Sequence, residues 1–204
     1  MIRAVIFDMD GVLIDAKEWH YEALNRALGL FGYEISRTDH LMSFDGLPTR
    51  RKLEILSQTD GLPVGLHSFI NAMKQDYTME IVHSMCKANF VQEYALSRLK
   101  AQGFLVGVAS NSVRSTVEVM MEKAQLARYM DVMLSNQDVS RAKPDPEIYQ
   151  LAMQRLGIKP EETLIVEDNE NGICAARASG ACVMVVNDVS DVNWDNINKH
   201  MNES

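Results

Sequence analysis

Short apolar runs recur along the chain, and each of them ends at polar residues. The first run covers residues 2–7, later ones cover 104–109, 163–166 and 182–186, and a weaker one covers 131–134. Runs of this length that are apolar throughout are typical of strands buried on both faces of a sheet. The pattern therefore predicts a sheet whose strands are spread over the whole chain.

The segments between the later runs predict helices. Plausible helices cover residues 112–125, 146–156 and 169–179, and the last of them ends at Gly180, a favourable residue just past a helix C-terminus. Strands that alternate with helices are joined by right-handed crossovers into a doubly wound parallel sheet. The expected fold class is therefore α/β.

The stretch from residue 16 to about 85 breaks this rhythm. It contains no convincing buried strand, and between Trp19 and Leu30 the apolar residues fall on one helical face. We expect an all-helical cap subdomain over residues 16–85, inserted after the first strand. The core would then be formed by residues 1–15 plus 86–204.

Composition and charge narrow the function classes. The chain has 204 residues, of which 47% are hydrophobic and 24% charged, as in ordinary globular proteins. Its 20 basic and 28 acidic residues give a net charge of −8 without a basic cluster, which argues against a nucleic-acid partner but permits a small anionic substrate.

The cysteines and the apolar segments indicate the cellular compartment in which we expect the protein. Cys86, Cys174 and Cys182 are odd in number and show no C-x-x-C spacing, which favours a reducing compartment. The N-terminus is too short for a signal peptide before it reaches Asp8, and no stretch approaches the roughly 18 apolar residues of a membrane span. We expect a cytoplasmic protein without a membrane partner.

Polar residues that could take part in catalysis or ligand binding follow the predicted strands. Ligands of parallel sheets bind beyond the carboxyl ends of the strands. The candidates in these positions are Asp8, Asp10, Ser110, Lys143, Glu167 and Asp168. Four close carboxylates repel one another, so some must be protonated or neutralised by a cation, and oxygen ligands favour Mg²⁺ above all.

This set of side chains suits phosphoryl transfer. A carboxylate such as Asp8 can attack phosphorus and form an acyl-phosphate, while Lys143 and Ser110 hold the phosphoryl oxygens. A second carboxylate two residues on can protonate the leaving oxygen and then deprotonate the incoming water or alcohol. Each motif alone has a simpler interpretation as a turn, a helix cap or solvated charge, but all of them occur in order, each after an apolar run.

Four segments resemble the four motifs of the haloacid-dehalogenase superfamily. They are Asp8–Asp15, Val108–Ser112, Lys143–Pro146 and Val166–Ile173. Their spacing is similar to that of the branch with a small helical cap, which includes β-phosphoglucomutase and phosphoglycolate phosphatase. The resemblance implies a Rossmann-like core with Asp8 as nucleophile and Asp10 as general acid and base. It also implies Mg²⁺ on Asp8, the Asp10 backbone carbonyl and Asp168 with Glu167 nearby, and a phosphoryl group on Ser110 and Lys143.

Asp10 also argues against one reaction of this superfamily. In this superfamily the dehalogenase branch is known to need no metal and to have no acid at this position, because a departing halide needs no proton. We therefore expect a phosphotransferase and not a dehalogenase.

Candidate substrate-binding residues lie in the cap and beside Ser110. By the same resemblance, His20 follows the first loop, Gly46 to Arg50 form a specificity loop, and Lys74 meets the distal end of the substrate; we add Asn111 in the core. Two cap cations would suit a phosphorylated sugar. The simpler interpretation is a partly buried histidine and solvated helix charges.

A phosphatase acting on a small phosphorylated metabolite is our first expectation, and a sugar phosphomutase the second. The mutase is weakened by Ala16, where the family has a hydroxyl residue, by Lys87–Val91 in place of a usual Pro-Gly, and by a specificity loop one residue longer before Arg50. A response-regulator receiver would carry its acceptor aspartate on a later strand and lack the insertion. A catalytically silent binding protein has little need for the joint set of motifs. We expect a monomer or weak dimer.

Overall fold

The computed structural model describes residues 1–44 and 46–203, and these form two compact units. One unit consists of Met1–Asp15 together with the chain from Cys86 onward, and the other consists of Ala16–Met85. We refer to them as the core and the cap and describe each by itself. Within the described residues, no helix combines the length and apolar character needed to cross a lipid bilayer.

The core is built on a five-stranded parallel sheet with the strand order β3-β2-β1-β4-β5. The strands are β1 Ala4–Phe7, β2 Leu105–Ala109, β3 Val132–Leu134, β4 Thr163–Glu167 and β5 Cys182–Val185. Each of the five apolar runs forms one of them, which confirms the predicted α/β fold. The central strand, β1, is buried along its whole length, as a strand covered by helices on both faces must be.

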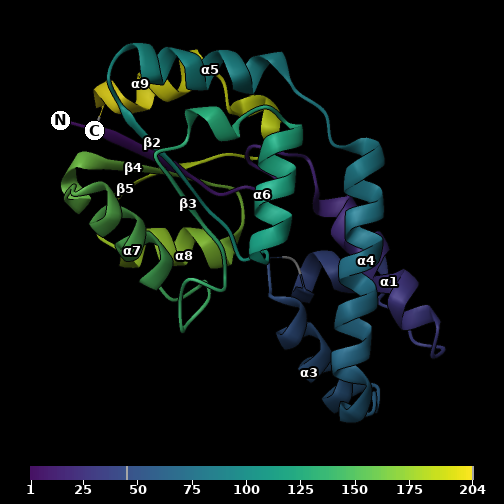
Figure 1. Ribbon diagram of the computed structural model, residues 1–204. Coiled ribbons are helices and arrows are strands. Elements are labelled where there is room, and N and C mark those ends of the chain that lie inside the picture. Colours follow the sequence, from purple (N-terminus) through teal and green to yellow (C-terminus); the bar gives the residue numbers. More distant parts are fainter. Residues whose placement is uncertain (45, 204) are drawn as a thin grey trace. The chain divides into compact units, whose positions relative to one another are not determined.

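Helices cover both faces of this sheet (Figure 1). They are α5 Phe90–Ala101, α6 Arg114–Lys123, α7 Glu147–Leu156, α8 Glu170–Ala178 and α9 Trp194–Glu203. Helices α7 and α8 lie on one face, where Ile148, Ala152 and Ala176 pack in one apolar cluster with Ile6 of β1. Helix α5 lies over the other face with α9 beside it (Figure 1).

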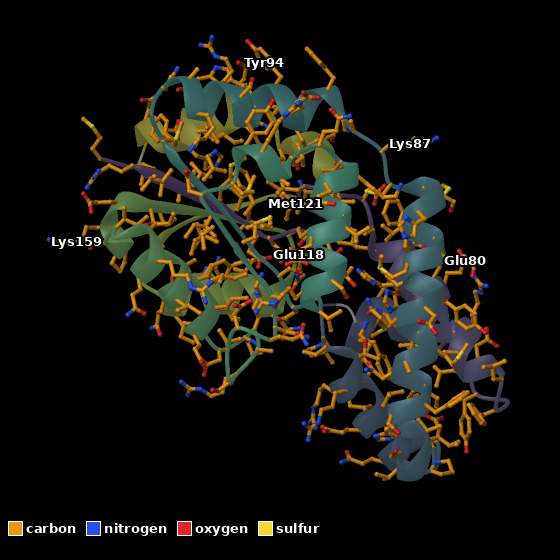
Figure 2. All side chains as sticks on the ribbon, in the orientation of Figure 1. Glu80, Lys87, Tyr94, Glu118, Met121 and Lys159 are labelled. Carbon is orange, nitrogen blue, oxygen red and sulfur yellow. The ribbon has the colours of Figure 1, made fainter. Side chains whose placement is uncertain are left out.

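The helices of the core divide their side chains between the sheet and the solvent. Met121 of α6 is fully buried, whereas Tyr94 on the outer side of α5 is 45% exposed (Figure 2). This one-sided burial is what joins an amphipathic helix to a sheet, because apolar area removed from water contributes about 25 cal/mol per Å². The packed helices hold the carboxyl ends of the strands in fixed positions.

The described residues of the cap form helices and turns around a small apolar core of their own. The helices are α1 Lys17–Gly29, α2 Arg37–Asp39, α3 Thr49–Thr59 and α4 His67–Met85, with a π-helical turn at His40–Phe44. Leu28 of α1 and Leu53 of α3 are buried in this core. Leu30, which we expected on the buried face of the first helix, is 54% exposed because α1 has already ended at Gly29.

Candidate active site

The register of the sheet brings candidate side chains from separate strands to the same level. Phe7 at the end of β1 pairs with Val108 of β2 on one side and with Val166 of β4 on the other. Asp8 continues this alignment, because its backbone N–H donates to the carbonyl of Val166 over 3.0 Å. Asp8, Ser110 and Glu167 therefore leave the sheet at its carboxyl edge, where parallel sheets bind their ligands.

A tight turn after β1 fixes the positions of Asp8 and Asp10. The carbonyl of Met9 accepts from the N–H groups of Leu13 and Ile14 over 3.0 Å each, and the N–H of Gly11 donates to the Ile14 carbonyl over 2.7 Å. Gly11 has a φ of 93°, a left-handed conformation that glycine adopts without strain. Gly11 of the D-x-D-G sequence is thus favoured by the turn itself, while the two aspartates supply carboxylates.

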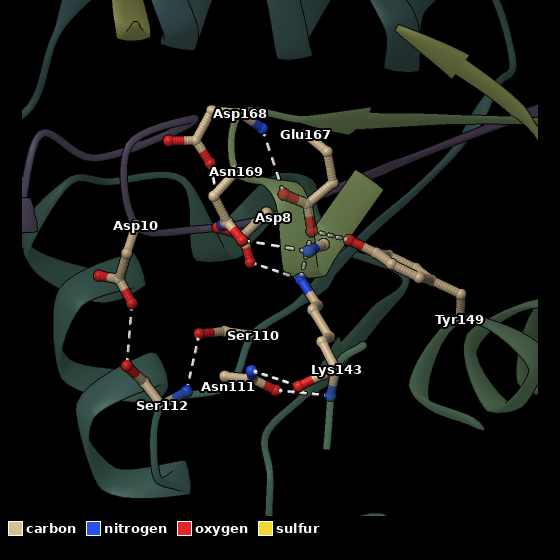
Figure 3. A network of polar contacts seen from close by, with 11 residues as sticks. Asp8, Asp10, Ser110, Asn111, Ser112, Lys143, Tyr149, Glu167, Asp168 and Asn169 are labelled. Carbon is tan, nitrogen blue, oxygen red and sulfur yellow. Dashed lines mark hydrogen bonds and ion pairs between the residues drawn. The ribbon is translucent and has the colours of Figure 1, made fainter. Parts of the chain in front are cut away.

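Lys143 lies between two carboxylates in the interior of the site (Figure 3). Its Nζ is 2.6 Å from Oδ1 of Asp8 and 2.7 Å from Oε1 of Glu167, and its side chain is only 2% exposed. Such a buried pair has excellent Coulombic geometry but a large desolvation cost, so it is weak support for stability and stronger support for function.

The pKa values of these groups follow from burial and from their neighbours. Burial raises the pKa of the Asp8 carboxyl well above its ordinary value; Lys143 opposes this, while Glu167 and Asp168 add to it. For Lys143, burial alone would lower the pKa, but the carboxylates of Asp8 and Glu167 outweigh it and raise the pKa. The ammonium therefore stays charged, and a further cation would favour the ionised form of Asp8.

Two residues that support Glu167 were missed by the sequence reasoning. Tyr149 of α7 is fully buried, donates its hydroxyl to Oε1 of Glu167, and places its ring 4.7 Å from Nζ of Lys143. Burial and the charge of Glu167 raise the pKa of Tyr149 well above its ordinary value, so the hydroxyl keeps its proton and donates. Gly172 of α8 leaves the space that the carboxylate fills, because a Cβ there would lie 1.9 Å from Oε1.

Three carboxylates form the group best suited to a metal ion in the described part of the chain. Ligand oxygens of Asp8, Glu167 and Asp168 all lie within 4.8 Å of one another. A set of oxygen donors fits a hard divalent cation such as Mg²⁺. The N–H of Asp168 donates to Oε2 of Glu167 over 3.2 Å, so Glu167 is already held by backbone and side-chain donors. The residues present therefore fit the metal that the sequence led us to expect.

The loop after β2 connects to three different parts of the site. Ser110 is 1% exposed, and its hydroxyl accepts from the N–H of Ser112 over 3.0 Å. Asn111, which we expect to bind substrate, also contacts the backbone of Lys143 through its side-chain amide: Oδ1 accepts from the Lys143 N–H over 3.1 Å. The hydroxyl of Ser112 donates to Oδ2 of Asp10 over 2.9 Å (Figure 3).

The expected cap residues differ in their surroundings within the cap. Nζ of Lys74 lies 3.1 Å from Nδ1 of His20. An ammonium can only donate, so in this hydrogen bond Nδ1 of His20 is the acceptor. Arg50 is 89% exposed and pairs with Glu54 on its own helix, and Gly46 has a φ of 70°. The core candidates thus gather in one network, whereas the cap candidates belong to the other unit.

Comparison with known proteins defines the class. A profile of the haloacid dehalogenase-like hydrolases matches residues 5–186, so the chain belongs to this family and is a hydrolase of that type. It is 30% identical over 179 residues to a phosphorylated carbohydrates phosphatase from Thermotoga maritima, covering 88% of this chain and 82% of that protein. It is 28% identical over 190 residues to the pyrophosphatase PpaX from Bacillus cereus, covering 88% and 80%.

The fold has close structural counterparts as well. A β-phosphoglucomutase from Clostridium difficile superposes with a TM-score of 0.86 at 20% identity, covering 100% of this chain and 98% of that one. At this identity the likeness establishes the shared fold. The predicted resemblance to the haloacid-dehalogenase superfamily is confirmed.

Proposed function

We propose that the chain is a Mg²⁺-dependent phosphatase that hydrolyses a small phosphorylated metabolite, a sugar phosphate in particular, through an aspartyl-phosphate on Asp8. The observation that carries the proposal is the buried contact between Asp8 Oδ1 and Lys143 Nζ at 2.6 Å, with Asp10 in the same turn. A carboxylate that is fixed beside a permanent cation at a strand end is suited to attack an anionic phosphoryl group. The name of the Thermotoga maritima relative supports the sugar-phosphate class.

In the first step, a carboxylate oxygen of Asp8 attacks phosphorus, and the bond between phosphorus and the substrate oxygen breaks. Asp10 donates its proton to that oxygen, which leaves as an alcohol. Lys143 and the hydroxyl of Ser110 bind phosphoryl oxygens and stabilise the charge that they carry in the transition state.

In the second step, water attacks the phosphorus of the aspartyl-phosphate and the bond to Asp8 breaks. Asp10, now ionised, takes the proton from the water, so inorganic phosphate leaves and both carboxyl groups return to their initial states. Asp8, Asp168 and the Asp10 carbonyl would hold the Mg²⁺, with Glu167 beside them. When bound, the ion supplies positive charge that lowers the repulsion between Asp8 and the phosphoryl group.

Substrate screening with Mg²⁺ tests the proposal. We expect a panel of sugar phosphates, phosphoglycolate and pyrophosphate to give free phosphate with at least one sugar phosphate, and EDTA to abolish the release. Asp8→Asn keeps the shape of the side chain and should abolish turnover with its folding transition retained. Rapid acid quenching followed by mass spectrometry should find one phosphoryl group on Asp8 of the wild type. Near-normal turnover of Asp8→Asn would refute the aspartyl-phosphate.

A sugar phosphomutase is the second candidate, and one observation favours it. The hydrogen bond between Lys74 and His20 in the cap joins the two residues whose mutase counterparts were suggested by sequence resemblance. A mutase would require a sugar bisphosphate as primer and would form isomer faster than free phosphate. We expect steady phosphate release without a primer; isomer formation from β-glucose 1-phosphate that outpaces phosphate release would favour the mutase. In either case we expect a cytoplasmic enzyme, monomeric or weakly dimeric.

A further inference from the structure

Ser112 makes a direct contact with the carboxylate that the proposed reaction uses for proton transfer. Its hydroxyl donates to Oδ2 of Asp10 over 2.9 Å, and the two residues come from different segments of the core, the turn after β1 and the loop after β2 (Figure 3). A hydroxyl has one proton, so donation to Asp10 leaves the Ser112 oxygen only as an acceptor for other groups.

The backbone of Ser112 is held on both sides. Its N–H donates to the hydroxyl oxygen of Ser110 over 3.0 Å, and its carbonyl accepts from the N–H of Asn136 over 3.1 Å. Asn136 is in turn tied to the same loop, because its side-chain amide donates to the Asn111 carbonyl over 2.8 Å. The hydroxyl that meets Asp10 is therefore presented by a backbone that is hydrogen-bonded at both its N–H and its carbonyl.

We propose that Ser112 is a positioning residue that orients the Asp10 carboxyl for proton transfer to the leaving oxygen. This inference rests on the proposed function, in which Asp10 is the general acid and base. The torsion that turns an aspartate carboxyl about its last bond is broad and has two equivalent minima, so the group needs an external partner to select one orientation. A donor fixed on Oδ2 makes that oxygen an acceptor and leaves Oδ1 to carry the proton that is transferred.

The dependence of the rate on the leaving group separates this role from a structural one. The alkoxide leaving group of a sugar or alkyl phosphate needs a proton on its oxygen. The nitrophenolate of a nitrophenyl phosphate departs without much protonation. We expect Ser112→Ala to lower kcat/KM, which reports formation of the aspartyl-phosphate, roughly tenfold on the alkyl substrate, a small part of the 10²–10⁴ that proton transfer contributes. It should change kcat/KM on the aryl substrate less than twofold, and Ser112→Thr, which keeps a hydroxyl, should restore kcat/KM on the alkyl substrate.

A double-mutant cycle with Asp10→Asn tests whether Ser112 acts through Asp10. With the acid removed, Ser112→Ala should have no further effect on the alkyl substrate, because the two changes disable the same step. Ser179→Ala is the matched control: Ser179 is a buried serine of the core, its hydroxyl donates to the Ala176 carbonyl over 2.6 Å, and its loss should leave the ratio of alkyl to aryl rates unchanged.

The outcomes distinguish the inference from the proposed function on which it depends. If Asp10→Asn lowers kcat/KM equally on both substrates, Asp10 is not the proton donor and the proposed mechanism itself fails. If Asp10→Asn lowers kcat/KM selectively on the alkyl substrate, the proposed function stands. The positioning role is then refuted if Ser112→Ala has no effect, accelerates the enzyme, lowers kcat/KM equally on both substrates, or adds fully in the Asp10→Asn background. Selective loss, rescue by threonine and non-additivity together would establish it.

Discussion

Lys143 in the core and Arg50 in the cap are both cations with a carboxylate partner, yet their surroundings are opposite. The Lys143 side chain is 2% exposed and lies between Asp8 and Glu167, whereas Arg50 is 89% exposed and faces Glu54 one helical turn away. An exposed pair of this kind contributes little and is screened by salt. A buried pair has no such freedom to separate or to be screened, since charges removed from water must stay paired in one geometry. The core therefore holds Lys143 and its two carboxylate partners in one buried arrangement, whereas the exposed Arg50 is held in place much less firmly.

The largest effect should come from removing the buried cation of the core. Lys143→Met keeps the length of the side chain but leaves Asp8 and Glu167 facing each other without a counter-charge. We expect a loss of about 3–5 kcal/mol in the free energy of unfolding, measured by urea denaturation. Activity should fall by about 10²–10³-fold or more, because a charged donor to the phosphoryl group is lost. A variant of unchanged stability would show that Lys143 does not compensate the buried charges of Asp8 and Glu167 as described above.

A smaller but still clear effect should follow from filling the space beside Glu167. In Gly172→Ala the new Cβ would lie 1.9 Å from Oε1 and 2.0 Å from the carboxyl carbon, so the Glu167 side chain must move. We expect a destabilisation of about 1–3 kcal/mol and a roughly tenfold loss of kcat.

Gly29→Ala in the cap is the matched control for that substitution. A Cβ at Gly29 has no neighbour within 4 Å in the described structure, and Gly29 ends helix α1. Helix propensity then favours alanine by at most about 1 kcal/mol, with no change in kcat. Equal effects of the two substitutions on turnover would contradict the contact between Gly172 and Glu167.

The core could be predicted from the sequence because its chemistry follows the strands. Each apolar run predicts where a strand ends, and the rule that ligands bind at the carboxyl edge then selects Asp8, Lys143 and Asp168. Tyr149 could not be found in this way, because an aromatic residue at helical spacing indicates only core packing, and its hydroxyl meets Glu167 through the tertiary fold. Gly172 did carry a signal: a glycine in the first turn of a helix is unfavourable and usually has a packing reason.

Less could be predicted for the cap by the same reasoning from the sequence. Its apolar periodicity predicted helices correctly. The candidate substrate-binding cations of the cap lie on helices, where a binding cation and a solvated one have the same sequence pattern. Arg50 and Arg51 illustrate the difficulty, since both pair with Glu54, over 3.2 and 3.1 Å. The contact of Asn111 with the Lys143 backbone could not be predicted either, because it joins residues 32 positions apart.

A moderate effect is expected from the tyrosine that was missed. Tyr149→Phe removes only the hydroxyl, so Oε1 of Glu167 keeps Lys143 as a donor and can draw it away from Asp8. Hydrogen bonds to charged groups contribute about 1.5–3 kcal/mol, and we expect a stability loss at the lower end of this range. The kcat should fall several-fold at saturating Mg²⁺ with little change in KM.

Tyr129→Phe provides the control in the same unit, since its hydroxyl lies 3.5 Å from Oε1 of Glu93 and outside the carboxylate network. That variant should match the wild type in both kcat and KM. A Tyr149→Phe enzyme with wild-type kcat would show that Lys143 is held by Asp8 and Glu167 without help from the hydroxyl.

The smallest effects are expected from the cap cations, and they should depend on the substrate. If Lys74 grips the distal end of a phosphorylated sugar, Lys74→Ala should raise KM several-fold for that sugar and leave nitrophenyl phosphate almost unaffected, because the aryl substrate has no distal group to bind. Arg50→Ala should act in the same direction but more weakly. Arg51→Ala is the matched control, since Arg51 shares Glu54 with Arg50 and was not a binding candidate. Equal changes in KM for both substrates would assign Lys74 to the cap's own structure, through its contact with His20, and would remove it from substrate recognition.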